Sequence, residues 1–177
     1  MRNTRFVLLK KWSIFTLCIF FFSVAQCAVG FLSILGVKPI FLLPLAIGFS
    51  MFLDQKDAAI LGLVCGFFWD CFSGRLFGYS SLILVVICVF ASLICFYIAH
   101  ISLGNYIVLV ILGVFIYNFV DFVFRYMIWN FENAWNIWIY HIIPTIAYTV
   151  LISPIIYILC KFIFEKFVSN KNNNYVR

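Results

Sequence analysis

The chain has 177 residues, of which 66% are hydrophobic and only 10% are charged, and its formal net charge is +6. A soluble domain carries about one quarter charged residues, so this composition excludes a soluble globular protein and predicts one transmembrane domain over residues 1–168. The basic residues gather at the two ends of the chain rather than along one helical face, which argues against nucleic-acid binding. Residues 169–177 are polar and aperiodic, and we expect a disordered C-terminal tail there.

The apolar runs predict an all-α, polytopic bundle of about six transmembrane helices. Four runs are long enough to cross a hydrocarbon core of about 30 Å at roughly 1.5 Å per residue; they are residues 12–35, 76–99, 103–129 and 137–160. Two further runs, residues 39–53 and 58–73, are short and marginal for spanning alone. They are either short helices buried among the others or a re-entrant hairpin. Both interpretations leave the remaining topology unchanged, because two spans or none preserve its parity.

The placement of lysine and arginine predicts that both termini are cytoplasmic. With six spans, nine basic residues share one side of the membrane, namely Arg2, Arg5, Lys10, Lys11, Lys56, Lys161, Lys166, Lys171 and Arg177. The opposite side keeps Lys38 and Arg75, while Arg125 lies within or near the fifth span. Since cytoplasmic loops carry the excess of basic residues, the larger group marks the cytoplasmic side of a multi-pass protein.

Small or acidic residues recur at every fourth position in the segment GLVCGFFWDCFSGRLFG. On a helix this spacing puts Gly62, Gly66 and Asp70 on one face, where glycines let a neighbouring helix approach closely. An ionisable group at membrane depth is costly unless it is paired or hydrated, so Asp70 is a functional-site candidate. The glycines of the following turn permit a tight reversal that brings Asp70 and Arg75 together at the outer interface. The candidate surface, for partner binding or for packing of the protein's own helices, comprises Gly62, Gly66, Asp70, Gly74, Arg75 and Gly78.

A second group of polar residues lies in the outer half of the fifth run. Asn118, Asp121 and Arg125 are three and four residues apart and therefore share a helical face. Two interpretations remain open. Asp121 and Arg125 neutralise each other locally, or Arg125 also pairs with Asp70 across helices, which gives an intramembrane polar cluster of Asp70, Asn118, Asp121 and Arg125.

The motifs of catalysis and of metal binding are missing. The two intramembrane aspartates stand in FFWD and NFVD rather than in GxGD, and the chain has no GxSG serine and no HExxH pair. The seven cysteines fall inside apolar runs without a CxxC pair, which is typical of core residues. We therefore predict no enzyme, no metal and no cofactor. Four of the five tryptophans are expected to anchor the outer interface, with a partner-binding aromatic patch as the alternative; they are Trp69, Trp129, Trp135 and Trp138.

The segment GLVCGFFWDCFSGRLFGYSSLIL resembles the central signature of the rod shape-determining protein MreD family. In that family a glycine-rich third helix carries an aspartate and leads through an SGxxxG turn into a long apolar helix. The C-terminal IIPTIAYTVLISPIIYILCKFIF, with Pro144 and Pro154 ahead of a basic end, resembles the family's last helix. The resemblance covers nearly the whole chain. Residues 101–140 match only in general character, so Asp121 and Arg125 cannot be carried over from the family.

The resemblance implies a non-enzymatic component of the cell-elongation machinery in the bacterial inner membrane. The implied partners are MreC, the MreB filament, the RodA glycosyltransferase with its penicillin-binding transpeptidase, and membrane lipids. The implied role is to organise or regulate peptidoglycan synthesis. The family's fold is similar to that of the S-component of energy-coupling-factor transporters, so a substrate-binding subunit of a vitamin transporter is the alternative function. Against transport, Ala25 and Ala28 do not form the AxxxA docking pattern, because Val29 occupies the required position.

Overall fold

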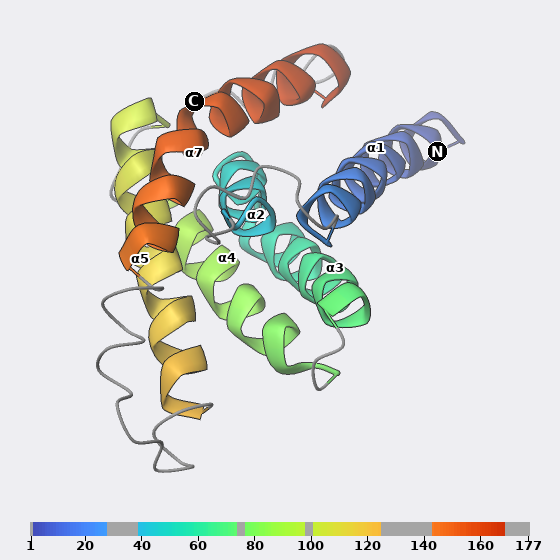
Figure 1. Cartoon of the computed structure of the whole chain (residues 1–177). Coiled ribbons are helices and arrows are strands. Elements are labelled where there is room, and N and C mark those ends of the chain that lie inside the picture. The colour runs from blue at the N-terminus through green and yellow to red at the C-terminus, as the bar shows by residue number, and fades with distance from the viewer. Residues whose placement is uncertain (1, 28–38, 74–76, 98–100, 125–142, 169–177) are drawn as a thin grey trace, which may run out of the picture.

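The computed structural model describes residues 2–27, 39–73, 77–97, 101–124 and 143–168, and within these ranges the protein is helical and has no strand. Six helices follow one another along this part of the chain (Figure 1), namely α1 (Arg2–Cys27), α2 (Leu42–Ser50), α3 (Gln55–Ser73), α4 (Tyr79–Tyr97), α5 (Leu103–Phe122) and α7 (Ile143–Ile163). A π-helical turn, Phe164–Val168, prolongs α7. The predicted all-α fold class is therefore confirmed.

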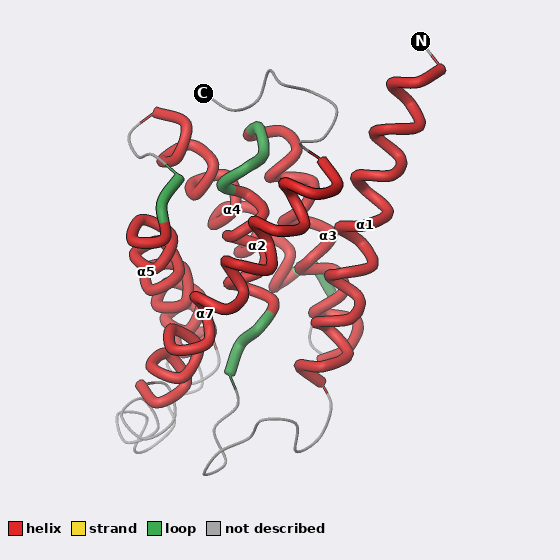
Figure 2. The backbone as a smooth tube through the Cα atoms, turned by 90° about the horizontal axis from the view of Figure 1, so that it is seen from above, coloured by secondary structure: helices red, strands yellow, loops and turns green. Residues whose placement is uncertain are grey.

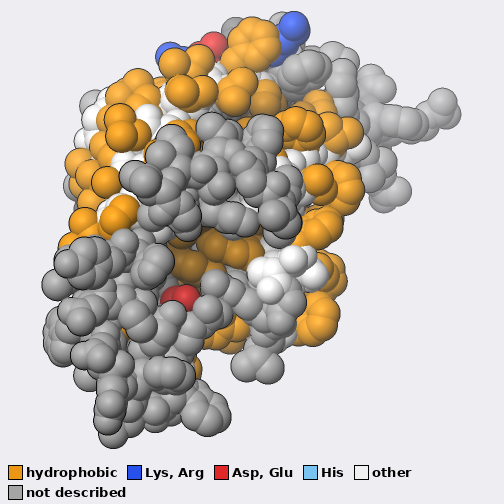
Figure 3. Space-filling model, in the orientation of Figure 1, with side chains coloured by type: hydrophobic (Ala, Val, Ile, Leu, Met, Phe, Trp, Pro, Cys, Tyr) orange, Lys and Arg blue, Asp and Glu red, His pale blue; other side chains and the backbone are white. Residues whose placement is uncertain are grey.

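Within the described residues, three helical stretches are long and apolar enough to cross a membrane, namely Tyr79–Tyr97, Leu103–Phe122 and Ile143–Lys166. In α1 the apolar part, Lys11–Gln26, is shorter, because the first turns of that helix are polar. Figure 3 shows hydrophobic side chains over most of the described surface on its face of the molecule. A surface of this kind suits a protein whose solvent is lipid, and the predicted membrane protein is confirmed.

The short helix α2 lies in the middle of the bundle, as both Figure 1 and Figure 2 show. All nine of its residues are buried, and at about 14 Å it is too short to cross the hydrocarbon core. Gly48 lies against Cys160, since an added Cβ would be 2.9 Å from its Sγ, and Tyr106 donates its hydroxyl to the carbonyl of Pro44 at 3.0 Å. For residues 39–53 the structure thus shows the short buried helix, the first of the two interpretations.

Side chains from three other helices, α1, α4 and α7, form hydrogen bonds with the backbone at the two ends of α2. The amides of residues 40–42 point at Gln26 and Thr149, whose side-chain oxygens accept them at 3.0 to 3.1 Å. At the other end Ser92 donates its hydroxyl to the carbonyl of Leu53 at 2.7 Å. These contacts satisfy backbone groups that a helix leaves unpaired at its ends, which is a strong requirement at membrane depth.

For residues 58–73 the structure shows a helix, α3, which begins three residues before the apolar run. α3 has 19 residues, which is about 28 Å, because the helix takes in polar residues 55–57 that the apolar run leaves out. Asp57 in its first turn forms an ion pair with Lys11 of α1, whose Nζ donates to Oδ2 at 2.6 Å. The negative charge is also favourable at the positive end of a helix dipole.

The last helix, α7, bends within its length, and Figure 1 shows its red C-terminal half turning away from the orange first half. Pro154 lies inside α7, where proline removes a backbone hydrogen bond and bends a helix. After the bend, Tyr157 and Phe164 stack on Phe52, with ring centroids 6.5 and 4.9 Å apart. The end of α7 therefore lies beside the α2–α3 turn, at the same end of the bundle as the Lys11–Asp57 pair.

Candidate functional site: a buried aspartate at the start of α4

Two glycines of α3 bring its backbone into contact with the backbone of α4. A Cβ added to Gly62 would lie 2.9 Å from the carbonyl oxygen of Leu84 and 2.9 Å from the Cα of Val85. A Cβ added to Gly66 would overlap the main chain of Ser81. Main-chain atoms cannot rotate away as a flexible side chain can. The glycine face of α3 is therefore covered by the protein's own α4.

Asp70 lies one turn further along the same face and is only 1% exposed. Its Oδ2 accepts the N–H of Gly78 at 2.9 Å, and its Oδ1 accepts the N–H of Ser80 at 3.1 Å. The hydroxyl of Ser81 donates to Oδ2 at 3.4 Å. The three donors lie at the start of α4 or, for Gly78, directly before it, so a carboxylate from α3 caps the N-terminus of α4. Hydrogen bonds to charged groups contribute about 1.5–3 kcal/mol each, and the negative charge also faces the positive end of the helix dipole.

The backbone of Gly78 turns its amide toward Asp70. Its φ is +91°, in the left-handed region that glycine adopts freely and that costs an L-residue roughly 1–2 kcal/mol. An added Cβ would meet no atom within 4 Å. The requirement for glycine at this position is thus conformational and does not come from lack of space.

An aromatic pair from α3 and α5 lies beside the cap. The hydroxyls of Ser80 and Tyr117 are 3.3 Å apart, and the ring of Tyr117 stacks on Trp69 with centroids 4.5 Å apart and an interplanar angle of 23°. Both rings are buried. Trp69 is therefore part of the interior, and the prediction that it anchors the outer interface is wrong. Trp69 is followed directly by the capping residue Asp70, and both side chains are buried.

The other predicted site residues are placed as follows. Asn118 donates its side-chain amide to the carbonyl of Val114 in its own helix at 2.8 Å, and Asp121 is half-buried near the end of α5. Three of the candidate site residues and three of the tryptophans lie outside the described residues; they are Gly74, Arg75 and Arg125, and Trp129, Trp135 and Trp138. The hydrogen bonds described at Asp70 come from α4, and a pair between Asp70 and Arg125 stays a prediction.

Sequence reasoning missed Ser80, Ser81 and Tyr117 as members of this site. Two signals point to them in retrospect. Ser80 and Ser81 follow Gly78 directly and open an apolar run, which is a pattern of helix N-termini. Tyr117 lies four residues before Asp121 and so shares a helical face with one of the polar residues already singled out.

The arrangement is suited to holding helices together. The carboxylate accepts three hydrogen bonds in a closed site, so most of its roughly four lone-pair sites are already engaged. Breaking those bonds would expose unpaired amides at membrane depth, where they are costly. In the ranges that the structure describes, no group of three or more His, Cys, Asp or Glu residues is close enough to hold a metal ion.

The comparison with known protein families gives one match. The sequence model of a family described as rod shape-determining protein MreD matches residues 5–168. No curated protein and no solved structure matches the chain. The expected similarity to the S-component fold therefore stays a prediction.

Proposed function

The chain belongs to the rod shape-determining protein MreD family, and from this premise we propose that it is a non-enzymatic scaffold of the cell-elongation machinery. In this proposal the protein lies in the bacterial inner membrane with both termini cytoplasmic. It binds MreC and helps to organise or regulate peptidoglycan synthesis by RodA and its penicillin-binding transpeptidase along the MreB filament.

The observation that carries the proposal is the capped α3–α4 turn. Asp70 holds the first amides of α4, and the glycines below it hold α3 and α4 in backbone contact. Because Asp70 accepts the amide of Gly78, the backbone directly after Phe77 is held in place. The side chain of Phe77 is 76% exposed, so it is available to a partner while the carboxylate is not.

The distribution of charge supports a periplasmic location for this turn. The ion pair of Lys11 and Asp57 lies at the start of α3, and Asp70 is 13 residues further along, which is about 20 Å. Lys56 is exposed beside that pair, and the end of α7 with its basic residues lies there as well. With the basic end in the cytoplasm, Phe77 faces the periplasm, where it would meet the membrane-proximal part of MreC.

The first experiment tests the function itself. Depletion of the protein in its host is expected to round or swell the cells, and expression of the intact chain is expected to restore rods. Normal shape together with a vitamin requirement would contradict the proposal and support the transporter alternative.

The second experiment tests the binding surface. A photoreactive benzoylphenylalanine at position 77 is expected to cross-link MreC in living cells, because Phe77 lies beside the capped turn. The matched control is position 162, since Phe162 is also an exposed phenylalanine but lies at the basic end. Equal cross-linking from the two positions, or none from position 77 in a protein that restores rod shape, would exclude the turn as the MreC contact.

A further inference from the structure

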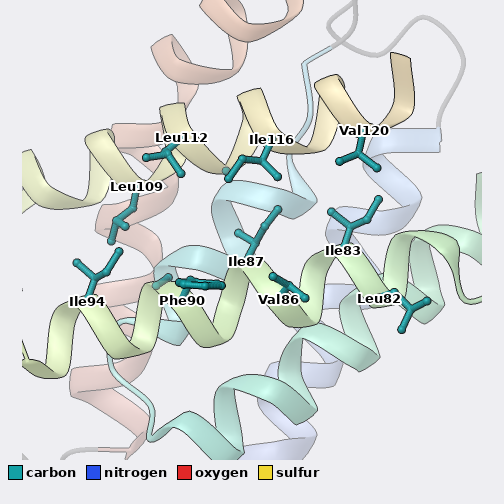
Figure 4. A pocket seen from close by; sticks show the side chains of 12 residues that line it. Leu82, Ile83, Val86, Ile87, Phe90, Ile94, Leu109, Leu112, Ile116 and Val120 are labelled. Atoms are coloured by element: carbon teal, nitrogen blue, oxygen red, sulfur yellow. The ribbon is translucent and has the colours of Figure 1, made fainter. Parts of the chain in front are cut away.

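A long apolar groove runs between α4 and α5. It has a volume of about 470 Å³ and is lined by twelve residues, all of them hydrophobic or glycine. Figure 4 shows that its walls come from the two helices, with side chains facing each other across the gap; they include Val86, Phe90, Leu112 and Ile116. The floor is closed by α2, because a Cβ on Gly113 would lie 2.8 Å from the Cδ1 of Ile47.

The groove opens toward lipid rather than water. Both of its helices are among the three that are apolar and long enough to cross the membrane, and Val86 on its wall is 53% exposed. A gap in such a place contains hydrocarbon or nothing, and an empty gap forfeits the dispersion contacts of every side chain that lines it. Filling it is therefore favourable.

The dimensions of the groove select the occupant. From Leu82 to Ile94 the groove follows α4 for 12 residues, or about 18 Å, so a volume of about 470 Å³ corresponds to a mean cross-section of about 26 Å². A helix about 10 Å across would need roughly 80 Å². A polymethylene chain packed at carbon contact distances of about 4 Å needs roughly 20 Å². Moreover, a stable protein interface uses roughly 20–30 residues on each side, and twelve line this groove.

We propose that the groove between α4 and α5 binds one acyl chain of a membrane phospholipid, aligned with the two helices. The acyl chain fills the space between α4 and α5, which are consecutive in sequence but separated over their middle turns. This groove does not include the Asp70 turn, and its occupation does not depend on any protein partner proposed above. Its ligand is a single unbranched hydrocarbon tail.

The experiment uses the full chain in nanodiscs of phosphatidylethanolamine and phosphatidylglycerol. A fraction of the phosphatidylglycerol carries a diazirine in the middle of one acyl chain, and the cross-linked residues are mapped by mass spectrometry after irradiation. We expect cross-links to concentrate on groove residues such as Val86 and Ile116. Val108 on α5 is 60% exposed but lies outside the groove, so it reports ordinary contact with bulk lipid.

A matched pair of substitutions tests occupancy. Val86→Trp fills the groove and is expected to abolish the groove cross-links, whereas Val108→Trp makes the same change elsewhere and is expected to leave them intact. Ile116→Trp fills the groove from the opposite wall and serves if Val86→Trp does not accumulate. Cross-links spread evenly over the lipid-facing residues, or unchanged in both filled variants, would overturn the proposal. So would a dimer formed through benzoylphenylalanine at position 116, which would assign the groove to a second copy of the chain.

Discussion

Replacing Asp70 with asparagine removes the charge that caps α4 and preserves the size of the side chain. The amide of asparagine offers one oxygen, so it can accept from Gly78 or from Ser80 but not from both as the carboxylate does. Its NH₂ group then faces the second N–H, which is left unpaired. A buried donor without a partner costs about 1–3 kcal/mol, and the lost charge at the helix N-terminus adds about 1 kcal/mol. We therefore expect Asp70→Asn to lower the free energy of unfolding by roughly 2–4 kcal/mol.

The measurement is unfolding of the purified protein in mixed micelles with an increasing fraction of sodium dodecyl sulfate. Asp54→Asn is the matched control, because Asp54 is exposed and immediately precedes α3, where asparagine caps a helix about as well as aspartate. The control is expected to stay within about 0.5 kcal/mol of the wild type. If Asp70→Asn unfolds at the same detergent fraction as Asp54→Asn, the charge of Asp70 does not stabilise the N-terminus of α4.

Two further substitutions test the packing of α3. Gly66→Ala is expected to destabilise the protein by about 1–3 kcal/mol, because the added Cβ would meet the backbone of α4. Its control is Gly104→Ala, where the added Cβ would have no atom within 4 Å, and this change is expected to be neutral or stabilising by up to about 1 kcal/mol. Equal effects of the two substitutions in the same unfolding assay would refute close backbone packing of α3 on α4. Lys11→Asp and Asp57→Lys are each expected to cost about 1 kcal/mol, since the paired side chains are 16% and 31% exposed and partly screened. The double swap is expected to recover part of that loss, and a swap that merely adds the two losses would show that the pair does not link α1 to α3.

The apolar runs predict which segments are helical, but they do not predict where each helix ends. The first run begins at residue 12, whereas α1 begins at Arg2, because backbone hydrogen bonds continue through polar residues that hydropathy excludes. Hydropathy measures which part of a helix suits lipid, and helix length is a separate property.

The candidate site is predictable in one respect and not in another. The four-residue spacing places Gly62, Gly66 and Asp70 on a common face because helix geometry is regular. The partners of Asp70 are amides eight and ten residues later in the chain, and their position depends on the positive φ of Gly78. Such a turn is local backbone geometry that no periodicity encodes. The burial of Trp69 was missed for a related reason, since its stacking partner comes from a distant segment.

The placement of α2 has a consequence for how the protein is made. A nine-residue helix cannot be released from the translocation machinery into lipid by itself, because it does not reach across the bilayer. The hydroxyls of Ser92 and Thr149 form hydrogen bonds with the backbone at the two ends of α2. They are synthesised roughly 40 and 100 residues after that helix. Residues 40–53 therefore stay incompletely hydrogen-bonded until the C-terminal helix is inserted, and a chain truncated before α7 would leave the amide of Ile40 without the hydroxyl of Thr149.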